Sequence, residues 1–414
     1  MEFLSWTIRL CVAVVFLVLE HFSFLIAATP SFWERDQLSG DWSGKRDAWV
    51  QQGYEFSFEY HTELFGNISG GKRRGVAFEG LGHAMMDVDL DRTFGWSNAN
   101  FRISSLWLHG TSPSSRFVGD DLAVSYIDGF DSLRLYETWV EKSFFENRFS
   151  MRAGNLLADE EFCAAGYGYI FLNAAFGWPT FISGSTLNTG PAFFVPGLGA
   201  RLRYELNESW YLQAGIYDGD TFDDANGDPT VNPHGFHFRL GKDQGYLSMY
   251  EMGFRSNQDA GAAGLPGHYR VGGWHHTGNF HDHDGLTTHG DNWGLYFAGD
   301  QMLWREEDEQ GLGLFYRVGG SPRNRNKFEW AMDGGLSYQG LIPGRDEDIA
   351  GIGVAFAQHS ADLTTDHEMA IEATYSIQLT PAIYLQPDVQ WIHHPGGGGI
   401  SDAWVVGLRI GFKF

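Results

Sequence analysis

The final segment, Trp404–Phe414, constrains the fold of this chain more than any other stretch. Large apolar side chains occupy every second position of the segment, and the positions between them carry Val, Gly, Arg and Lys. Because successive side chains of a β-strand point to opposite faces, this alternation predicts a strand with one apolar face. Such a strand fits a transmembrane β-barrel, whose outer face meets lipid, or a soluble sandwich of two sheets.

The same two-residue rhythm recurs in roughly sixteen segments between Tyr54 and Phe414, with 234–241 doubtful. In Leu198–Leu206, for example, the polar face carries Arg201 and Arg203. The core of a sandwich could not accept such charges, whereas a water-filled lumen could. We therefore predict an all-β fold: a closed antiparallel transmembrane β-barrel of about sixteen strands, with a short N-terminal helical lead-in and an inward-folding constriction loop.

Composition supports a barrel over other membrane proteins. The chain has 54 Gly, 33 Phe, 17 Tyr and 15 Trp, which is typical of many twisted strands with aromatic girdles. After the N-terminal region, no uninterrupted apolar run is long enough for a membrane helix. A net charge of -24 argues against nucleic-acid binding, which needs a basic surface.

The N-terminus has the features of an export signal. Arg9 precedes the apolar run Leu10–Leu19, and small residues end the region at Ala28, after which we expect cleavage. The expected domains are a signal peptide over 1–28, a periplasmic lead-in over 29–53 and a barrel over 54–414. The mature chain would retain Cys163 as its one thiol, which excludes an internal disulfide framework.

Within the lead-in, residues 40–53 predict a short helix. Asp41 or Ser43 can cap its start and Gly53 can end it. Helical spacing would then place three side chains near one face: Trp42, Arg46 and either Trp49 or Val50.

Two connections are longer than a hairpin requires. The first runs from about Leu156 to Gly197, and loops of this length usually have a function. In a pore, we expect it to fold inward and narrow the channel. The second lies between Tyr217 and His234 and is rich in aspartate. It lacks the spacing of an EF-hand, so a solvated outer loop fits it better than a calcium site.

The ordered motifs of the chain resemble the carbohydrate-selective porins of Gram-negative outer membranes, the OprB type. That resemblance implies a sixteen-stranded barrel with a constriction through which sugars enter the periplasm by diffusion. Its partners would be mono- or small oligosaccharides and outer-membrane lipid, in a monomer or a homotrimer. The loops at 218–234 and 275–291 depart from the pattern. The matching segments are Leu38–Gly44, Glu63–Gly71 followed by Arg73, Arg74 and Gly75, Leu106–Gly110, Leu133–Glu141, Arg152–Asp159, Phe176–Pro179, Arg203–Asn207, Trp210–Gly219 and Trp404–Phe414.

A sugar-selective constriction must replace part of the solute's hydration without holding it too tightly. An arginine guanidinium donates several hydrogen bonds in one plane, and carboxylates accept hydrogen bonds. Aromatic rings offer a flat apolar face to the C–H side of a sugar. Arg152 has lumen parity and directly precedes the long connection, so it is the first candidate. The other candidates are Glu137, Asn155, Asp159, Glu160, Arg201, Arg203, Arg134 and, as a stacking surface, Trp178. Each of them equally suits a structural role, as a lumen charge that a neighbour satisfies.

Arg134 and Glu137 have opposite parity, so both can point inward only across a β-bulge. This makes Arg134 the least certain position of the set.

The sequence also bears on other functions. A barrel enzyme would need a nucleophile with an orienting base, and no convincing Ser/His pair is present. A porin for anions such as phosphate is favoured by the arginines and opposed by the lumen carboxylates, and a less selective diffusion porin is a further alternative. Histidines and aspartates crowd 275–291 and could hold zinc or copper, but no ligand spacing is specified, which favours an exposed loop. We therefore expect no cofactor and no metal.

Overall fold

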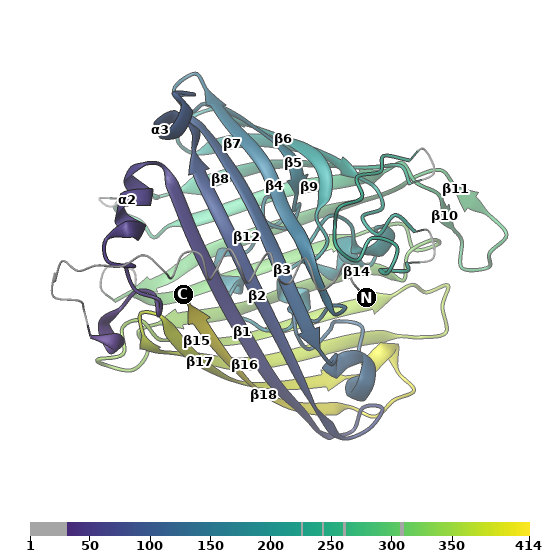
Figure 1. Ribbon diagram of the computed structural model, residues 1–414. Coiled ribbons are helices and arrows are strands. Elements are labelled where there is room, and N and C mark those ends of the chain that lie inside the picture. Colours follow the sequence, from purple (N-terminus) through teal and green to yellow (C-terminus); the bar gives the residue numbers. More distant parts are fainter. Residues whose placement is uncertain (1–30, 225–226, 242–243, 260–261, 307–309) are drawn as a thin grey trace, which may run out of the picture.

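The computed structural model describes residues 31–224, 227–241, 244–259, 262–306 and 310–414. Within these residues, sixteen strands close into one antiparallel barrel, with β1 paired to β18 (Figure 1). The expected closed β-barrel is therefore confirmed. The barrel strands are β1 (Tyr54–Ser69), β2 (Gly75–Asp89), β3 (Ala99–Gly110), β4 (Ser132–Phe144), β5 (Phe149–Leu156), β6 (Gly197–Glu205), β7 (Trp210–Asp218), β8 (Tyr246–Ser256), β9 (Gly267–His276), β12 (Asn292–Arg305), β13 (Gly311–Gly320), β14 (Phe328–Gln339), β15 (Ile349–His359), β16 (His367–Thr380), β17 (Ile383–His393) and β18 (Ala403–Lys413).

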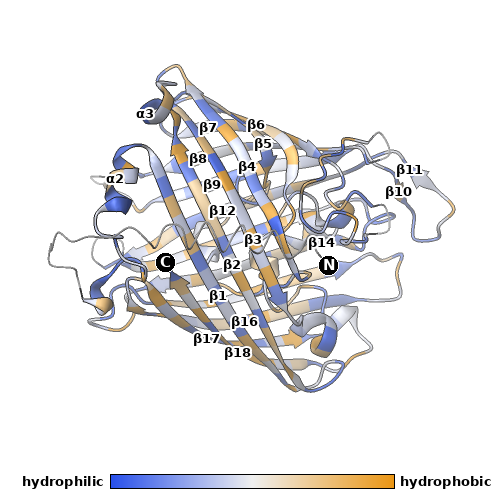
Figure 2. Ribbon diagram, in the orientation of Figure 1, coloured by the Kyte–Doolittle hydropathy of each residue, from blue (hydrophilic) through white to orange (hydrophobic). Residues whose placement is uncertain are grey.

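The alternation in the terminal strand separates the two faces of the barrel wall. In β18, Trp404 and Val406 are 47% and 39% exposed on the outside, while Val405 and Arg409 are buried inside. Apolar and polar positions alternate along other strands as well (Figure 2). Because lipid meets the outer face and the lumen the inner one, this pattern positions the wall's charges for a role inside the barrel.

The connections differ between the two ends of the barrel. At the end that carries the C-terminus, the strands are joined mostly by short segments. Long connections gather at the opposite end, which we call the loop end, including the hairpin of β10 (Phe280–His281) and β11 (Thr288–His289) (Figure 1). The helices and single turns are η1 (Phe32–Glu34), α2 (Lys45–Gln51), α3 (Leu90–Phe94), η2 (Ser114–Val118), η3 (Gly166–Gly168), η4 (Ala174–Phe176), α4 (Thr180–Ser183), η5 (Leu187–Thr189) and η6 (Pro395–Gly397). Among the described residues, no helix has the length and hydropathy needed to cross a membrane.

Two of the long connections enter the barrel. Residues 157–196, between β5 and β6, are the long connection that the sequence indicated, and we call them the second inner loop. Residues 111–131, between β3 and β4, form a first inner loop that the sequence analysis did not identify. The acidic connection is longer than expected: it runs over 219–245, because the doubtful segment 234–241 forms no strand.

The lead-in contains the expected short helix, with one correction. Gly44, with φ of 82°, occupies the N-cap of α2, and neither Asp41 nor Ser43 does. Trp42 and Ser43 already adopt left-handed φ values of 51° and 59°, so the chain turns before the helix begins. The expected face does form: the guanidinium of Arg46 lies 4.2 Å from the ring centre of Trp42. The signal peptide expected over 1–28 lies outside the described residues.

Candidate functional site

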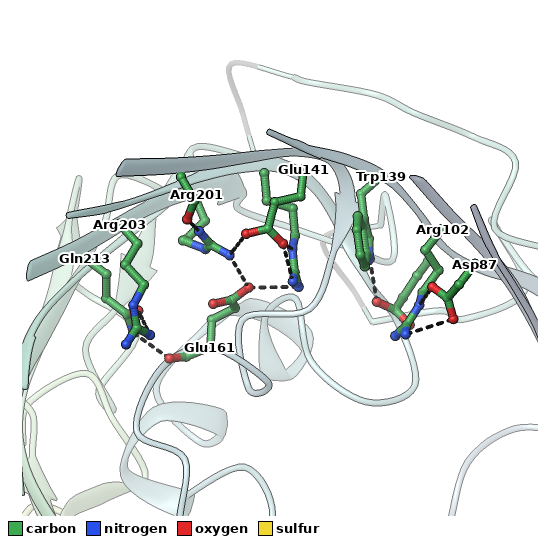
Figure 3. A network of polar contacts seen from close by, with 11 residues as sticks. Asp87, Arg102, Trp139, Glu141, Glu161, Arg201, Arg203 and Gln213 are labelled. Carbon is green, nitrogen blue, oxygen red and sulfur yellow. Dashed lines mark hydrogen bonds and ion pairs between the residues drawn. The ribbon is translucent and has the colours of Figure 1, made fainter. Parts of the chain in front are cut away.

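Four charged side chains form the centre of a polar network on the inner wall (Figure 3). Arg152 on β5 and Arg201 on β6 both contact Glu141 of β4, at 2.7 and 2.9 Å. Both also contact Glu161 of the second inner loop, at 2.8 and 3.0 Å. Antiparallel pairing sets Glu141, Arg152 and Arg201 side by side across three strands, because they are register partners. Each carboxylate therefore bridges two guanidiniums, and Glu161 ties the loop to the wall.

The network extends along the wall to β3. There the Arg102 Nε lies 2.7 Å from the Asp87 carboxylate, and its Nη1 lies 3.5 Å from Glu137. Glu137 also accepts a hydrogen bond of 2.7 Å from the indole Nε1 of Trp139. The guanidiniums of Arg102 and Arg152 lie 5.3 and 4.1 Å from the centre of the Trp139 ring. The indole therefore spaces the two cations and contributes cation–π stabilisation.

On the other side, Arg203 continues the same row. Its Nε donates to Glu205 at 2.8 Å, and its guanidinium lies 3.8 Å from the centre of the Tyr211 ring. Arg255 of β8 reaches the same Glu205. We call Arg102, Arg152, Arg201 and Arg203 the arginine row.

Members of the arginine row differ in their access to water. The side chains of Arg102, Arg152 and Arg203 are 27%, 19% and 26% exposed, whereas that of Arg201 is 3% exposed. The first three can therefore present donors to a solute, while Arg201 mainly holds the carboxylates in place. Every member has a carboxylate partner, so the row adds little net positive charge to the lumen.

The second inner loop is fixed by wall side chains that bind its backbone. Arg317 of β13 donates to the carbonyls of Cys163, Ala175, Phe176 and Gly177 at 2.7–3.1 Å. The carboxylate of Glu372 on β16 accepts two backbone N–H groups of the loop, Leu172 at 2.6 Å and Asn173 at 2.9 Å. Buried backbone groups need such partners, and here the wall supplies them in place of a sheet.

The first inner loop docks in the same way. Glu368 of β16 accepts the N–H groups of Asp121 and Leu122 at 2.8–2.9 Å. The Tyr126 N–H donates to the Leu172 carbonyl at 2.8 Å, which joins the two inner loops. A sequence signal for this loop existed: residues 111–131 exceed hairpin length, as the other long connections do.

Of the sequence candidates, Arg152, Glu137, Arg201 and Arg203 come together in the network. Asp159 and Glu160 lie at the start of the second inner loop, close to this network. Asp159 accepts the Phe193 N–H at 2.9 Å. Burial, with the nearby Glu137 carboxylate, raises the pKa of Asp159 to about 6 and that of Glu160 to about 8. Glu160 is therefore largely protonated at neutral pH.

Arg134 and Asn155 lie apart from this network. The register of β3 against β4 shifts between Ile103 and Ser105, so β4 carries the bulge that lets Arg134 and Glu137 both face inward. Arg134 and Asn155 line a small pocket beside Asp218, and the Asn155 amide donates to the Tyr136 carbonyl at 2.6 Å. Both side chains are buried, which suits support of the wall rather than contact with a solute.

Trp178 does not offer the open stacking surface that the sequence suggested. It is 8% exposed, packs within the main apolar cluster of the inner loops, and donates from Nε1 to the Thr189 carbonyl at 2.8 Å. The sequence could not separate a lumen-facing ring from a buried one in an irregular loop, because no strand period applies there.

Instead, a different set of aromatic rings is partly exposed. These rings contact one another in edge-to-face pairs with centroids 5.1–6.3 Å apart. They come from both inner loops and from the 219–245 connection, which is why no local sequence pattern reveals them. We call them the aromatic row: Tyr126, Phe130, Phe193, Phe194 and Phe222.

In their described residues, the two loops considered for metals hold no group of side chains with metal-ligand spacing. Of the described residues in 275–291, His276 is buried with Nε2 2.7 Å from the Gly219 carbonyl, and His289 lies 2.8 Å from Asp282. No metal-ligand group forms among the described residues there. In 218–228, Asp218 and Asp220 are buried, so the expectation of a solvated loop is wrong for them. Asn188 of the second inner loop donates to Asp220 at 2.7 Å, which draws that aspartate inward.

Comparison with known proteins decides the family. Residues 73–414 match the family described as Carbohydrate-selective porin, OprB family. The chain belongs to this family. The porin is 25% identical over 423 residues to "Putative porin QuiX" of Acinetobacter baylyi, covering 92% of this chain and 94% of the other. It is 24% identical over 427 residues to Porin B of Pseudomonas aeruginosa, with 90% of each chain covered.

Among solved structures, this porin is similar in fold to the high-pH structure of Pseudomonas putida OprB. The TM-score is 0.82 at 22% identity, with 93% of this chain and 100% of that chain covered. Family and fold together point to an outer-membrane channel rather than an enzyme.

Proposed function

We propose that this porin passes neutral sugars by passive diffusion across the outer membrane into the periplasm. The observation that carries the proposal is the arginine row, which is partly exposed to water and paired throughout with carboxylates. Such a surface offers fixed donors and acceptors at close spacing. A solute with many hydroxyl groups can exchange its hydration for these groups and still leave.

The aromatic row supports the same class of solute. A pyranose has polar edges and an apolar C–H face, so it suits a passage that offers hydrogen bonds and ring faces together. We propose that hydroxyl groups meet Arg102, Arg152 and Arg203 while C–H faces meet the aromatic row, in particular Phe193 and Phe194. A general diffusion pore needs no such pairing of surfaces.

Charge balance argues against an anion porin. Phosphate would be drawn by guanidiniums whose charge is not already compensated. Arg152 and Arg201 share Glu141 and Glu161, and Arg102 and Arg203 pair with Asp87 and Glu205. A less selective diffusion porin remains the alternative that the transport experiment must separate.

Liposome swelling with purified porin tests the proposal. We expect swelling with glucose, slower swelling with larger oligosaccharides, and weak swelling with phosphate. Equal rates for neutral and anionic solutes of one size would favour the less selective pore. No swelling with any sugar would refute the proposed function.

Sugar block of the ion current through a planar bilayer tests the arginine row itself. Replacing Arg152 with Gln removes donors that a charged group supplies, and such bonds contribute about 1.5–3 kcal/mol. We therefore expect Arg152→Gln to weaken sugar block roughly tenfold or more. Arg323→Gln is the matched control, because Arg323 pairs with Asp362 at 3.6 Å outside the lumen network. An equal loss in both variants would contradict a role for Arg152.

A further inference from the structure

Three histidines meet at the loop end of the barrel, away from the lumen network. His367 begins β16, His393 ends β17, and His394 follows directly. Each offers a ring nitrogen, and these nitrogens all lie within 4.8 Å of one another. Among the described residues, this is the one group of three or more potential metal ligands that meets this spacing. Only β16–β17 pairing brings His367 close to the other two, so the linear sequence conceals the group.

The cluster lies on the outside of the barrel wall. Along β17, Val389 is 41% exposed and Ile392 is fully buried, so alternation turns Trp391 and His393 outward. The Trp391 ring lies 5.2 Å from the His393 ring. The three histidines therefore lie at the aromatic rim and play no part in the proposed sugar path.

Two of the imidazole rings are each held by a carboxylate that contacts one ring nitrogen. Asp402 Oδ2 lies 2.8 Å from His393 Nδ1, and Asp366 Oδ2 lies 3.0 Å from His367 Nδ1. In this arrangement Nδ1–H donates to the carboxylate, which leaves Nε2 with a lone pair. Metal-binding histidines are commonly oriented by a carboxylate in this way.

His394 contributes a further observation. Its Nδ1 is buried and has no hydrogen-bond partner within the described part of the chain. A buried polar atom without a partner is costly, and a cation at this position would satisfy it. The backbone N–H of His394 donates to Asp402 at 3.1 Å, so one carboxylate positions both adjacent histidines.

We propose that His367, His393 and His394 form a binding site for a divalent late first-row transition metal, with Zn²⁺ as the principal candidate. An all-imidazole donor set suits Zn, Cu and Ni and does not suit Ca or Mg. Tetrahedral zinc with bonds of about 2.0–2.1 Å sets its nitrogens about 3.4 Å apart. The bound state therefore requires ring movements that bring the nitrogens closer than their present limit of 4.8 Å, with water as the fourth ligand.

Isothermal titration of the detergent-solubilised barrel with ZnCl₂ tests the site. The full chain must carry no histidine tag. We expect saturable binding of one Zn²⁺ per chain, weakened at least tenfold in His393→Ala. The matched control is His109→Ala, because His109 lies 4.6 Å from Trp107 at the same end of β3 and is outside the cluster. Wild-type affinity is expected for this control.

A second variant distinguishes a metal site from a cluster of aromatic and histidine rings that pack together without binding a metal. Asp402→Asn keeps all three imidazoles and removes the orienting charge, so we expect a 10- to 100-fold loss of affinity. Co²⁺ should give visible absorption bands of tetrahedral coordination in the wild type, and these should be lost in His393→Ala. Heat-modifiable gel migration confirms that each variant is folded. Absence of Zn²⁺ binding by the wild type, or equal binding by His393→Ala and His109→Ala, would overturn the proposal.

Discussion

Arg152 and Arg201 share two carboxylates, and this sharing determines how each residue behaves. A guanidinium buried to 3% exposure, as at Arg201, is retained inside a protein only with well-placed partners. Glu141 and Glu161 supply them at 2.9 and 3.0 Å. Arg201 therefore holds both carboxylates in place. Arg152 shares these carboxylates but is more exposed, so it can also contact a solute.

Glu160 leads to a prediction about pH at the scale of one residue. Burial raises its pKa from 4.5 to about 8, so folding favours the protonated form. Its contribution to stability is fully present below pH 4.5 and is lost as the pH rises through 8. Ionisation also adds negative charge near the arginine row. We expect cation preference, measured as reversal potential in a salt gradient, to increase between pH 7 and pH 9.

The Glu160→Gln variant is the control for this prediction. Its reversal potential should change little between pH 7 and pH 9, since the amide does not ionise. Asp159, with a pKa of about 6, completes its titration mostly below this interval. A wild-type step that persists unchanged in Glu160→Gln would assign the pH dependence to another group.

Strand parity determined which single residues could be predicted. It placed Arg152, Arg201 and Arg203 in the lumen, because the period of two holds along β5 and β6. It also required a bulge for Arg134 and Glu137, which β4 contains. The partners of these residues were beyond reach, since the Glu161 contact depends on the path of an irregular loop.

At the scale of elements, the two inner loops replace secondary structure with side-chain anchors. Arg317 illustrates the principle: one guanidinium satisfies carbonyls from Cys163 to Gly177 and also pairs with Asp333 at 2.8 Å. The loop thereby gains a defined shape without a sheet or a long helix. Because the loop is anchored in this way inside the barrel, a constriction formed by it would be rigid.

Replacing Arg317 with Met should therefore loosen the second inner loop. The substitution leaves Asp333 unpaired and several buried carbonyls without donors, and loss of one partner of a buried pair costs about 3–5 kcal/mol. Unfolding by guanidinium chloride in detergent measures the loss. Arg323→Met is the control, because the exposed pair of Arg323 contributes about 0–1 kcal/mol. A loss below 1 kcal/mol for Arg317→Met would contradict the anchoring role.

The two inner loops show how far the sequence alone can predict the role of a connection. Length alone identified 157–196 as an inward loop, since it greatly exceeds a hairpin. The same argument applied to 111–131, but the sequence there shows no feature that separates an inner loop from an outer one. Docking depends on Glu368 and Glu63, which lie far away in the sequence.

For the whole molecule, the outer face of the barrel should be in contact with lipid. Met332, at the middle of β14, is 45% exposed, and Leu341, in the turn after this strand, is 51% exposed. An arginine costs about 2–4 kcal/mol at the midplane of a bilayer and about 0–1 kcal/mol near the interface. We therefore expect Met332→Arg to destabilise the barrel in lipid vesicles by the larger amount and Leu341→Arg by the smaller. Equal losses would contradict this placement of the bilayer.

The anchoring of the inner loops also links their docking to closure of the barrel. Residues near position 121 find their acceptor on Glu368, and Ser125 finds its acceptor on Glu63, which pairs with Arg409 of the last strand. A nascent chain that lacks β16–β18 therefore has an open barrel and lacks Glu368, which anchors the first inner loop. In the native fold, closure of the barrel by its last strands and docking of the first inner loop therefore depend on the same side chains.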